Sequence, residues 1–130
     1  GQNCMCGSRL YIHEKVFDRV LEGVARVANA IRVGPGLAPD TQIGPLISAR
    51  QRERVHGYVR SGVAEGGTVL AGGEPIDGPG FFYRPTLFAS NRPDLTILRE
   101  EIFGPVTCAQ RFATDDLDEI ADLANDTTYG

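Results

Sequence analysis

The sequence contains only three cysteines, two histidines and one lysine, and it has no long apolar run. Three cysteines are too few and too oddly numbered for the disulfide framework of a secreted domain, so Cys4, Cys6 and Cys108 are expected to be free thiols. No apolar stretch approaches the roughly 20 residues of a membrane span. No charged-then-apolar leader resembles a signal peptide. We therefore expect a cytoplasmic protein without a membrane partner.

Positive charge is also sparse. Lys15 is the only lysine, and the twelve arginines are scattered among 17 acidic residues, which gives a net charge of -4 and a pI near 5.1. Because no basic run is present, the electrostatic footprint of a nucleic-acid or anionic-membrane partner is missing. With 42% hydrophobic and 23% charged residues, the 130-residue chain has the composition and length of one globular domain.

Apolar periodicity predicts three helices. Positions repeating at steps of three and four predict a first helix over 15–32, ended by Gly34-Pro35-Gly36. Ser48 and Gln51 fit a capping box at the start of a second helix, which runs to Gly66-Gly67. Thr114 is expected to cap the last helix. The side chains expected to face inward are Phe17, Val20, Leu21, Val24, Val27, Ala28 and Ile31, then Val55, Tyr58, Val59 and Val63, then Leu117, Ile120, Ala121 and Ala124.

Four short segments suit strands better than helices: "SRLYIHE", "TVLAGG", "FFYRPTLFA" and "VTCAQRF". In the third, Pro85 favours a sheet edge or a bulge. Residues 34–46 hold three prolines and three glycines and are expected to form an ordered loop. The order β, α, α, β, β, β, α predicts an α/β fold. Because the chain opens inside a loop and stops directly after a helix, we expect it to be a piece of a larger protein.

Cys4 is the first candidate functional residue. A cysteine attacks a carbonyl carbon only as the thiolate, and Gly1 and Gly7, three residues to either side, would permit close backbone approach around the sulfur. Two other interpretations stay open from the residues alone. Cys4 could be a small half-buried hydrophobic residue, or it could pair with Cys6 as a redox couple or a metal ligand. A metal site usually needs four ligands.

"GQNCMCGSR" resembles the active-site cysteine segment of the NAD(P)-dependent aldehyde dehydrogenase superfamily. "REEIFGPV" at 99–106 resembles the Glu-x-Phe-Gly-Pro element of that family, and "NDTTYG" resembles a later segment of the same catalytic domain. The three segments occur in the family's order, and "GGTVLAGG", "GPGFFYRPTLF" and "IGPL" between them are also similar. The resemblance covers essentially the whole chain. It implies a Rossmann-like open sheet flanked by helices, within the catalytic domain.

The resemblance also implies residue roles. Cys4 would be the nucleophile that forms a thiohemiacetal and then a thioester, and its backbone N–H would donate to the oxyanion. Glu101 matches the glutamate that binds the nicotinamide ribose, and Phe103 matches the aromatic residue beside the nicotinamide ring. Gln51 and Arg54 lie where some relatives place polar residues near the cofactor, although capping explains Gln51 equally well. The implied cofactor is NAD, with NADP as the other possibility, and no metal is implied.

By the same resemblance, residues 1–130 are a partial catalytic domain, and the dinucleotide-binding domain and the strand used in subunit assembly lie outside them. The fragment alone is then expected to be inactive, while the complete enzyme would oxidise an aldehyde to a carboxylic acid and form a homodimer or homotetramer. Two alternatives remain: a cysteine hydrolase or esterase that uses Cys4 without hydride transfer, and a non-catalytic scaffold. The hydrolase lacks a convincing base, because His13 and His56 have no identifiable orienting partner in the sequence.

Overall fold

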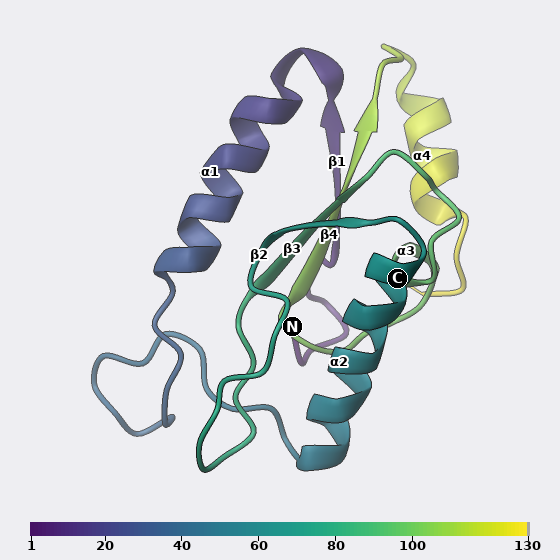
Figure 1. The fold of residues 1–130 in the computed structure, drawn as a ribbon. Helices are drawn as coiled ribbons and strands as arrows, with labels where there is room; N and C mark the ends of the chain where they lie inside the picture. The colour runs from purple at the N-terminus through teal and green to yellow at the C-terminus, as the bar shows by residue number, and fades with distance from the viewer. Residues whose placement is uncertain (130) are drawn as a thin grey trace.

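An open four-stranded sheet carries helices on both faces in the computed structural model, which describes residues 1–129 (Figure 1). The strands are β1 (Arg9–His13), β2 (Thr68–Ala71), β3 (Thr86–Ser90) and β4 (Val106–Phe112). They lie in the order β1-β4-β3-β2. β1, β4 and β3 are parallel, whereas β2 pairs with β3 in the antiparallel direction. The predicted α/β fold is confirmed.

The helices are α1 (Phe17–Ala30), α2 (Ala49–Ala64), α3 (Thr96–Arg99) and α4 (Leu117–Asn125), and a 3-10 turn, η1 (Glu14–Val16), precedes α1. The predicted cap of α2 is confirmed, since the Ser48 hydroxyl accepts a hydrogen bond from the Gln51 amide at 3.1 Å. None of the helices found within residues 1–129 has both the length and the apolar character that a membrane crossing requires.

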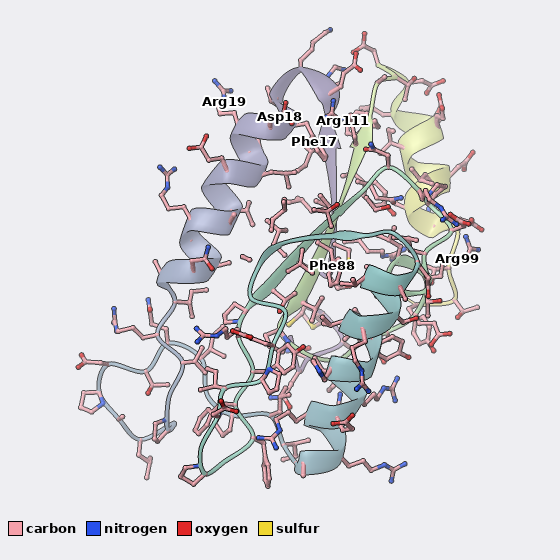
Figure 2. The ribbon with its side chains drawn as sticks, viewed as in Figure 1. Phe17, Asp18, Arg19, Phe88, Arg99 and Arg111 are labelled. Carbon is pink, nitrogen blue, oxygen red and sulfur yellow. The ribbon has the colours of Figure 1, made fainter. Side chains whose placement is uncertain are left out.

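The two faces of the sheet belong to two separate hydrophobic clusters, because successive side chains of a strand point to opposite faces. In β3, Phe88 packs into the cluster of α2 and α3, while its neighbour Leu87 packs with α1. In β4, Cys108 and Ala109 divide in the same way. Figure 2 shows Phe88 on the α2 side of the sheet, away from α1.

Several predicted boundaries were wrong. β3 begins after Pro85 rather than at residue 81, since proline cannot donate to the strand ladder. The cap of α4 is Asp116, whose carboxylate accepts from the Asp118 amide at 2.9 Å. Thr114 instead accepts a hydrogen bond from the Asp116 amide in the preceding turn. The short helix α3 was not predicted.

Four side chains predicted to face inward are exposed: the small Ala121 and three larger ones. Val27, Val63 and Leu117 have exposed fractions of 61%, 53% and 76%. Each lies at the margin of an apolar helical stripe, and the periodicity that marks a stripe does not show how much of it a neighbouring element covers. The most buried positions of the first two stripes were predicted correctly, including Phe17, Leu21 and Val55.

The parallel strands bring three distant parts of the chain together at the same end of the sheet, where these strands begin. The amino-terminal segment leads into β1, the segment after α3 leads into β4, and the loop that follows β2 leads into β3. Because β1, β4 and β3 run in the same direction, these three entry segments meet at the amino-terminal ends of the strands. The candidate site lies there.

Candidate active site

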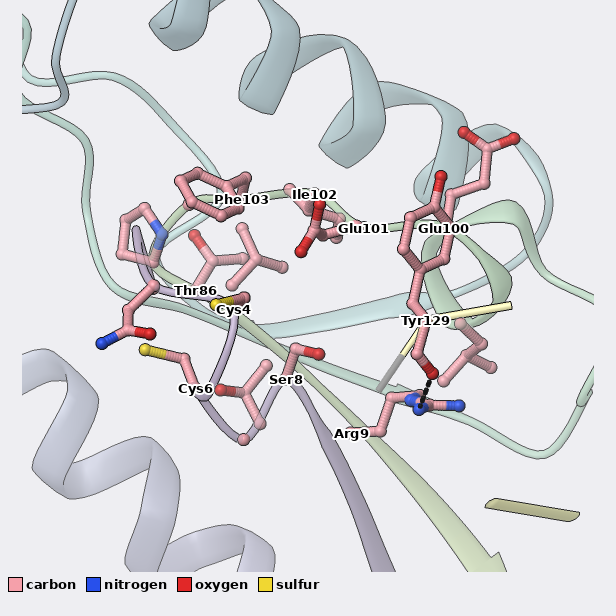
Figure 3. A pocket seen from close by; sticks show the side chains of 18 of the residues that line it. Cys4, Cys6, Ser8, Arg9, Thr86, Glu100, Glu101, Ile102, Phe103 and Tyr129 are labelled. Atoms are coloured by element: carbon pink, nitrogen blue, oxygen red, sulfur yellow. Dashed lines mark hydrogen bonds between the residues drawn. The ribbon is translucent and has the colours of Figure 1, made fainter. Parts of the chain in front are cut away.

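A cavity of about 230 Å³ opens where the three entry segments meet. Its lining includes Cys4 from the segment before β1, Glu101 and Phe103 from the segment before β4, and Thr86 at the start of β3. Figure 3 shows Cys4 facing the segment that carries Glu101 and Phe103. The structure therefore brings together three of the four predicted site residues, although 97 positions separate Cys4 from Glu101 in the sequence.

Cys4 occupies a tight turn formed by its own neighbours. The carbonyl of Asn3 accepts a hydrogen bond from the Cys6 amide at 3.0 Å, and the Asn3 side chain accepts one from the Met5 amide at 2.9 Å. Asparagine favours this position because its side chain reproduces a turn hydrogen bond. None of the hydrogen bonds found within residues 1–129 uses the amide N–H of Cys4. Cys4 is exposed, which contradicts the interpretation as a half-buried hydrophobic residue.

Gln2 ties this turn to the segment before α2. Its side-chain oxygen accepts a hydrogen bond from the Ile47 amide at 2.9 Å, and its side-chain nitrogen donates to the Pro45 carbonyl at 3.3 Å. In the sequence, Gln2 is marked only by its place in the segment that resembles the family's active-site cysteine segment. Its two bonds reach residues more than 40 positions away, and no local pattern in the sequence could have predicted them.

Gly1 and Gly104 allow the turn, the loop and α2 to come close together. A Cβ added at Gly1 would overlap the Gly104 carbonyl and lie 2.8 Å from the Pro105 nitrogen. A Cβ at Gly104 would in turn lie 3.0 Å from Cγ1 of Val55 in α2. Gly1 does allow a close backbone approach, but to Gly104 and Pro105 of the facing loop and not to the Cys4 sulfur as predicted. At Gly7 the predicted close approach was wrong, because a Cβ there would meet nothing within 4 Å.

The two adjacent glutamates differ in their surroundings. The Glu100 carboxylate accepts a hydrogen bond from the Tyr58 hydroxyl at 2.6 Å, and this bond raises the pKa of Tyr58. Glu101 is half-buried, and its carboxylate extends toward the cavity in Figure 3, whereas that of Glu100 points away from Cys4. Glu101 is therefore the carboxylate that faces the thiol.

Phe103 adopts a backbone conformation that is rare for its residue type. Its φ of 57° is the only positive φ of a non-glycine residue among residues 1–129. A left-handed backbone costs an aromatic residue on the order of 1–2 kcal/mol, so it persists only where surrounding contacts enforce it. The residue is 37% exposed and lies on the cavity wall. Strained residues of this kind cluster at ligand-binding sites.

The model of the aldehyde dehydrogenase family matches residues 1–130. The chain belongs to the aldehyde dehydrogenase family. It is 45% identical to a mitochondrial aldehyde dehydrogenase of Leishmania tarentolae and 37% identical to an NADP(+) succinate-semialdehyde dehydrogenase of Mycobacterium avium. These matches cover 100% of this chain but only 26% and 27% of the relatives, so the chain spans about a quarter of their length.

A solved structure shows the same fold. The chain superposes on the NAD+ complex of an aldehyde dehydrogenase from Bacillus cereus with a TM-score of 0.94 and 42% sequence identity. The superposition covers 100% of this chain and 26% of that one. The open sheet flanked by helices is therefore that of an aldehyde dehydrogenase, as the resemblance implied.

Gln51, the fourth predicted site residue, does not line the cavity. Its side-chain nitrogen donates to the carbonyls of Phe103, at 2.8 Å, and Ile102, at 3.3 Å. One turn further along α2, the guanidinium of Arg54 donates to the Glu101 carbonyl at 3.0 Å. The backbone amide of Gln51 makes the capping bond, while its side chain holds the loop that carries Glu101 and Phe103.

The two histidines lie away from Cys4. His13 has a carboxylate partner, Asp115 at 3.5 Å. It is the last residue of β1, however, and lies at the carboxyl-terminal end of the strand, away from the cavity. His56 is hydrogen-bonded to the Tyr83 hydroxyl at 3.0 Å on the far side of α2 from the loop. Neither lines the cavity that holds the thiol, so the structure offers Cys4 no histidine base for a hydrolase mechanism.

The remaining cysteines differ from Cys4 in position or accessibility. Cys6 is exposed on the cavity wall, whereas Cys108 is buried in the core cluster, where burial raises the pKa of its thiol to about 12. No group of three or more histidine, cysteine or acidic side chains close enough to hold a metal occurs among residues 1–129. Among residues 1–129, Cys4 and Cys6 are the thiols that line the cavity.

Proposed function

We propose that the complete protein oxidises an aldehyde to a carboxylic acid with NAD(P), using Cys4 as the nucleophile. The observation that carries this proposal is the single cavity lined by the exposed thiol of Cys4, the carboxylate of Glu101 and the strained Phe103. Family membership supplies the reaction class, and the convergence of these side chains supports its assignment to this site.

The proposed reaction begins with the Cys4 thiolate adding to the aldehyde carbon. The carbonyl oxygen takes negative charge in that step, and the amide N–H of Cys4 would donate to it. Removal of one such donor costs on the order of 3 kcal/mol in comparable sites. A nicotinamide cofactor held by Glu101 and Phe103 would supply the hydride acceptor that converts the thiohemiacetal on Cys4 into a thioester. Water then hydrolyses the Cys4 thioester, which releases the carboxylic acid and regenerates the thiolate, a good leaving group.

The residues of this chain fit a nicotinamide cofactor. Glu101 can accept two charge-assisted hydrogen bonds from neighbouring ribose hydroxyls, because its carboxylate faces the cavity while Glu100 is engaged by Tyr58. The partly exposed ring of Phe103 offers a flat apolar surface to a planar ring. We propose NAD as the cofactor, with NADP as the other possibility, since the relatives include a protein solved with NAD+ and one named for NADP(+).

The experiment measures reduced-cofactor formation by the complete enzyme with a panel of aldehydes and each cofactor. Cys4→Ala is expected to lower the rate by on the order of 10³-fold or more, as loss of a covalent nucleophile does elsewhere. Cys6→Ala, which removes the neighbouring exposed thiol, is the matched control and is expected to stay within about threefold of wild type. Aldehyde oxidation that survives Cys4→Ala would overturn the proposal. Cofactor-independent ester hydrolysis without aldehyde oxidation would favour the cysteine hydrolase, and neither activity would favour the scaffold.

We further propose that the dinucleotide-binding domain and the assembly strand lie outside residues 1–130, so that the fragment alone is inactive. The share of the relatives' length that this chain spans supports this division. We propose a homodimer or homotetramer for the complete enzyme, testable by light scattering. The net charge of -4 on these 130 residues speaks against a nucleic-acid partner. We also propose a cytoplasmic location, although one relative is mitochondrial. Fractionation of cells expressing the complete protein tests the location.

A further inference from the structure

One face of α2 holds the loop that carries Glu101 and Phe103. Gln51, Arg54 and Tyr58 are spaced three and four residues apart, which places their side chains on the same side of the helix. Gln51 donates to the carbonyls of Ile102 and Phe103, Arg54 to that of Glu101, and Tyr58 to the carboxylate of Glu100. Each successive position along the helix face thus holds the preceding part of the loop. We call these three side chains the α2 clamp.

The loop depends on these contacts because it lies outside the helices and strands. Residues 101–103 form neither helix nor strand between the end of α3 and the start of β4. Side chains of α2 occupy their carbonyls instead, and the bond from Gln51 to the Phe103 carbonyl is 2.8 Å long. That bond falls on the residue with φ of 57°, where an unsupported backbone would relax to an ordinary conformation.

The clamp also separates the two adjacent carboxylates. Tyr58 binds the side chain of Glu100, whereas Arg54 binds only the backbone of Glu101. The guanidinium of Arg54 lies 5.5 Å from the Tyr58 ring centroid and 3.4 Å from its hydroxyl, so the two clamp residues also support each other. The Glu101 carboxylate is consequently left to the cavity, with its backbone fixed.

We propose that Arg54 is a positioning residue for the nicotinamide cofactor, acting with Gln51 and Tyr58 through the loop backbone to orient Glu101 and Phe103. Arg54 does not line the cavity, so its effect passes through the Glu101 carbonyl rather than through contact with the cofactor. This inference rests on the proposed function, because it assumes that Glu101 and Phe103 face a cofactor.

The test compares Arg54→Ala with Arg50→Ala in the complete enzyme. Arg50 is an exposed arginine in the first turn of the same helix, so its replacement removes the same charge without touching the loop. Three quantities are measured: the dissociation constant of the reduced cofactor by fluorescence titration, kcat with a saturating aldehyde, and the rate at which iodoacetamide alkylates Cys4 without cofactor. Hydrogen exchange of peptides covering residues 100–105 reports the loop directly.

Loss of one charge-assisted hydrogen bond predicts cofactor binding about tenfold weaker in Arg54→Ala, with faster exchange in residues 100–105. Cys4 alkylation should stay within about twofold of wild type, because Gln2 anchors the thiol segment to the residues before α2 and not to the loop. Arg54→Lys should recover part of the affinity, and Arg50→Ala should match wild type throughout. If Arg54→Ala is poorly folded, Tyr58→Phe removes a single hydroxyl from the clamp and should show a smaller change of the same kind.

Faster loop exchange with unchanged cofactor affinity would overturn the positioning role, and so would equal losses in Arg54→Ala and Arg50→Ala. Failure of the proposed function gives a different result. If wild type neither binds cofactor nor oxidises any aldehyde, yet Arg54→Ala still loosens residues 100–105, the clamp is real and the proposed function is wrong.

Discussion

Replacing Gly1 by alanine should separate the thiol segment from the loop that faces it. The new Cβ would overlap the Gly104 carbonyl and lie 2.8 Å from the Pro105 nitrogen. Both groups are backbone, and Gly104 itself is packed against Val55, which is fully buried. The loop has no room to retreat, so the thiol segment has to move by on the order of 1 Å. A displacement of this size at a reacting group can cost about 10²-fold in rate, which corresponds to about 2.7 kcal/mol.

The assay is kcat/KM for an aldehyde in the complete enzyme, with the thermal midpoint measured in parallel. Gly1 is exposed, so Gly1→Ala should fold normally while its kcat/KM falls by about 10²-fold. Gly7→Ala is the matched control: it lies equally far from Cys4 on the other side, and its Cβ would meet nothing within 4 Å. Its kcat/KM should change by less than about threefold. Full activity in Gly1→Ala, or equal losses in both variants, would refute the argument from close backbone approach.

Three further measurements test other parts of the structure. Peptide mapping after brief iodoacetamide treatment at neutral pH should find Cys4 and Cys6 modified. Cys108 should stay unmodified until the protein is denatured, because burial raises the pKa of its thiol to about 12. Labelling of Cys108 in the native protein would contradict its burial in the core. Hydrogen bonds lower the pKa of Glu65 below its ordinary value of 4.5, so its contribution to stability is present above that value and is lost as the pH falls through the lowered pKa. In Glu65→Gln, the free energy of unfolding measured with denaturant should therefore fall less steeply at acid pH. An unchanged acid dependence would argue against these bonds. Gln2→Ala removes two hydrogen bonds and should speed amide exchange in the segment before α2 by about tenfold, whereas wild-type exchange would show that Gln2 does not anchor it.

Local sequence signals predicted most of the elements, because each depends on residues close together in the chain. Neighbouring residues alone predict the capping of α2 by Ser48 and the strand 106–112, and both were found as predicted. The helix cap at 114 was wrong by two positions, since Thr114 and Asp116 are both good capping residues and only the turn geometry decides between them.

The site was predicted only in part. Cys4, Glu101 and Phe103 follow from the family resemblance, and the structure places them around one cavity. The structural role of Gln51 could not be predicted, because its partners lie about 50 residues away and come within reach only when α2 packs beside the entry to β4. The same limit applies to Gln2. Hydrogen bonds from side chains to distant backbone carbonyls leave no periodic pattern in a sequence.

These distant contacts converge on α2 and the residues before it. Gln2 ties the thiol segment to the residues that precede α2. The α2 clamp holds the loop of Glu101 and Phe103, and Val55 of the same helix packs against Gly104. The helix contributes no lining to the cavity. It nevertheless supports the facing loop directly and the thiol segment through the residues before it, and the proposed chemistry depends on the distance between the two. The separation of Cys4 from Phe103 is therefore set by the packing of α2 on the sheet, more than by either segment alone.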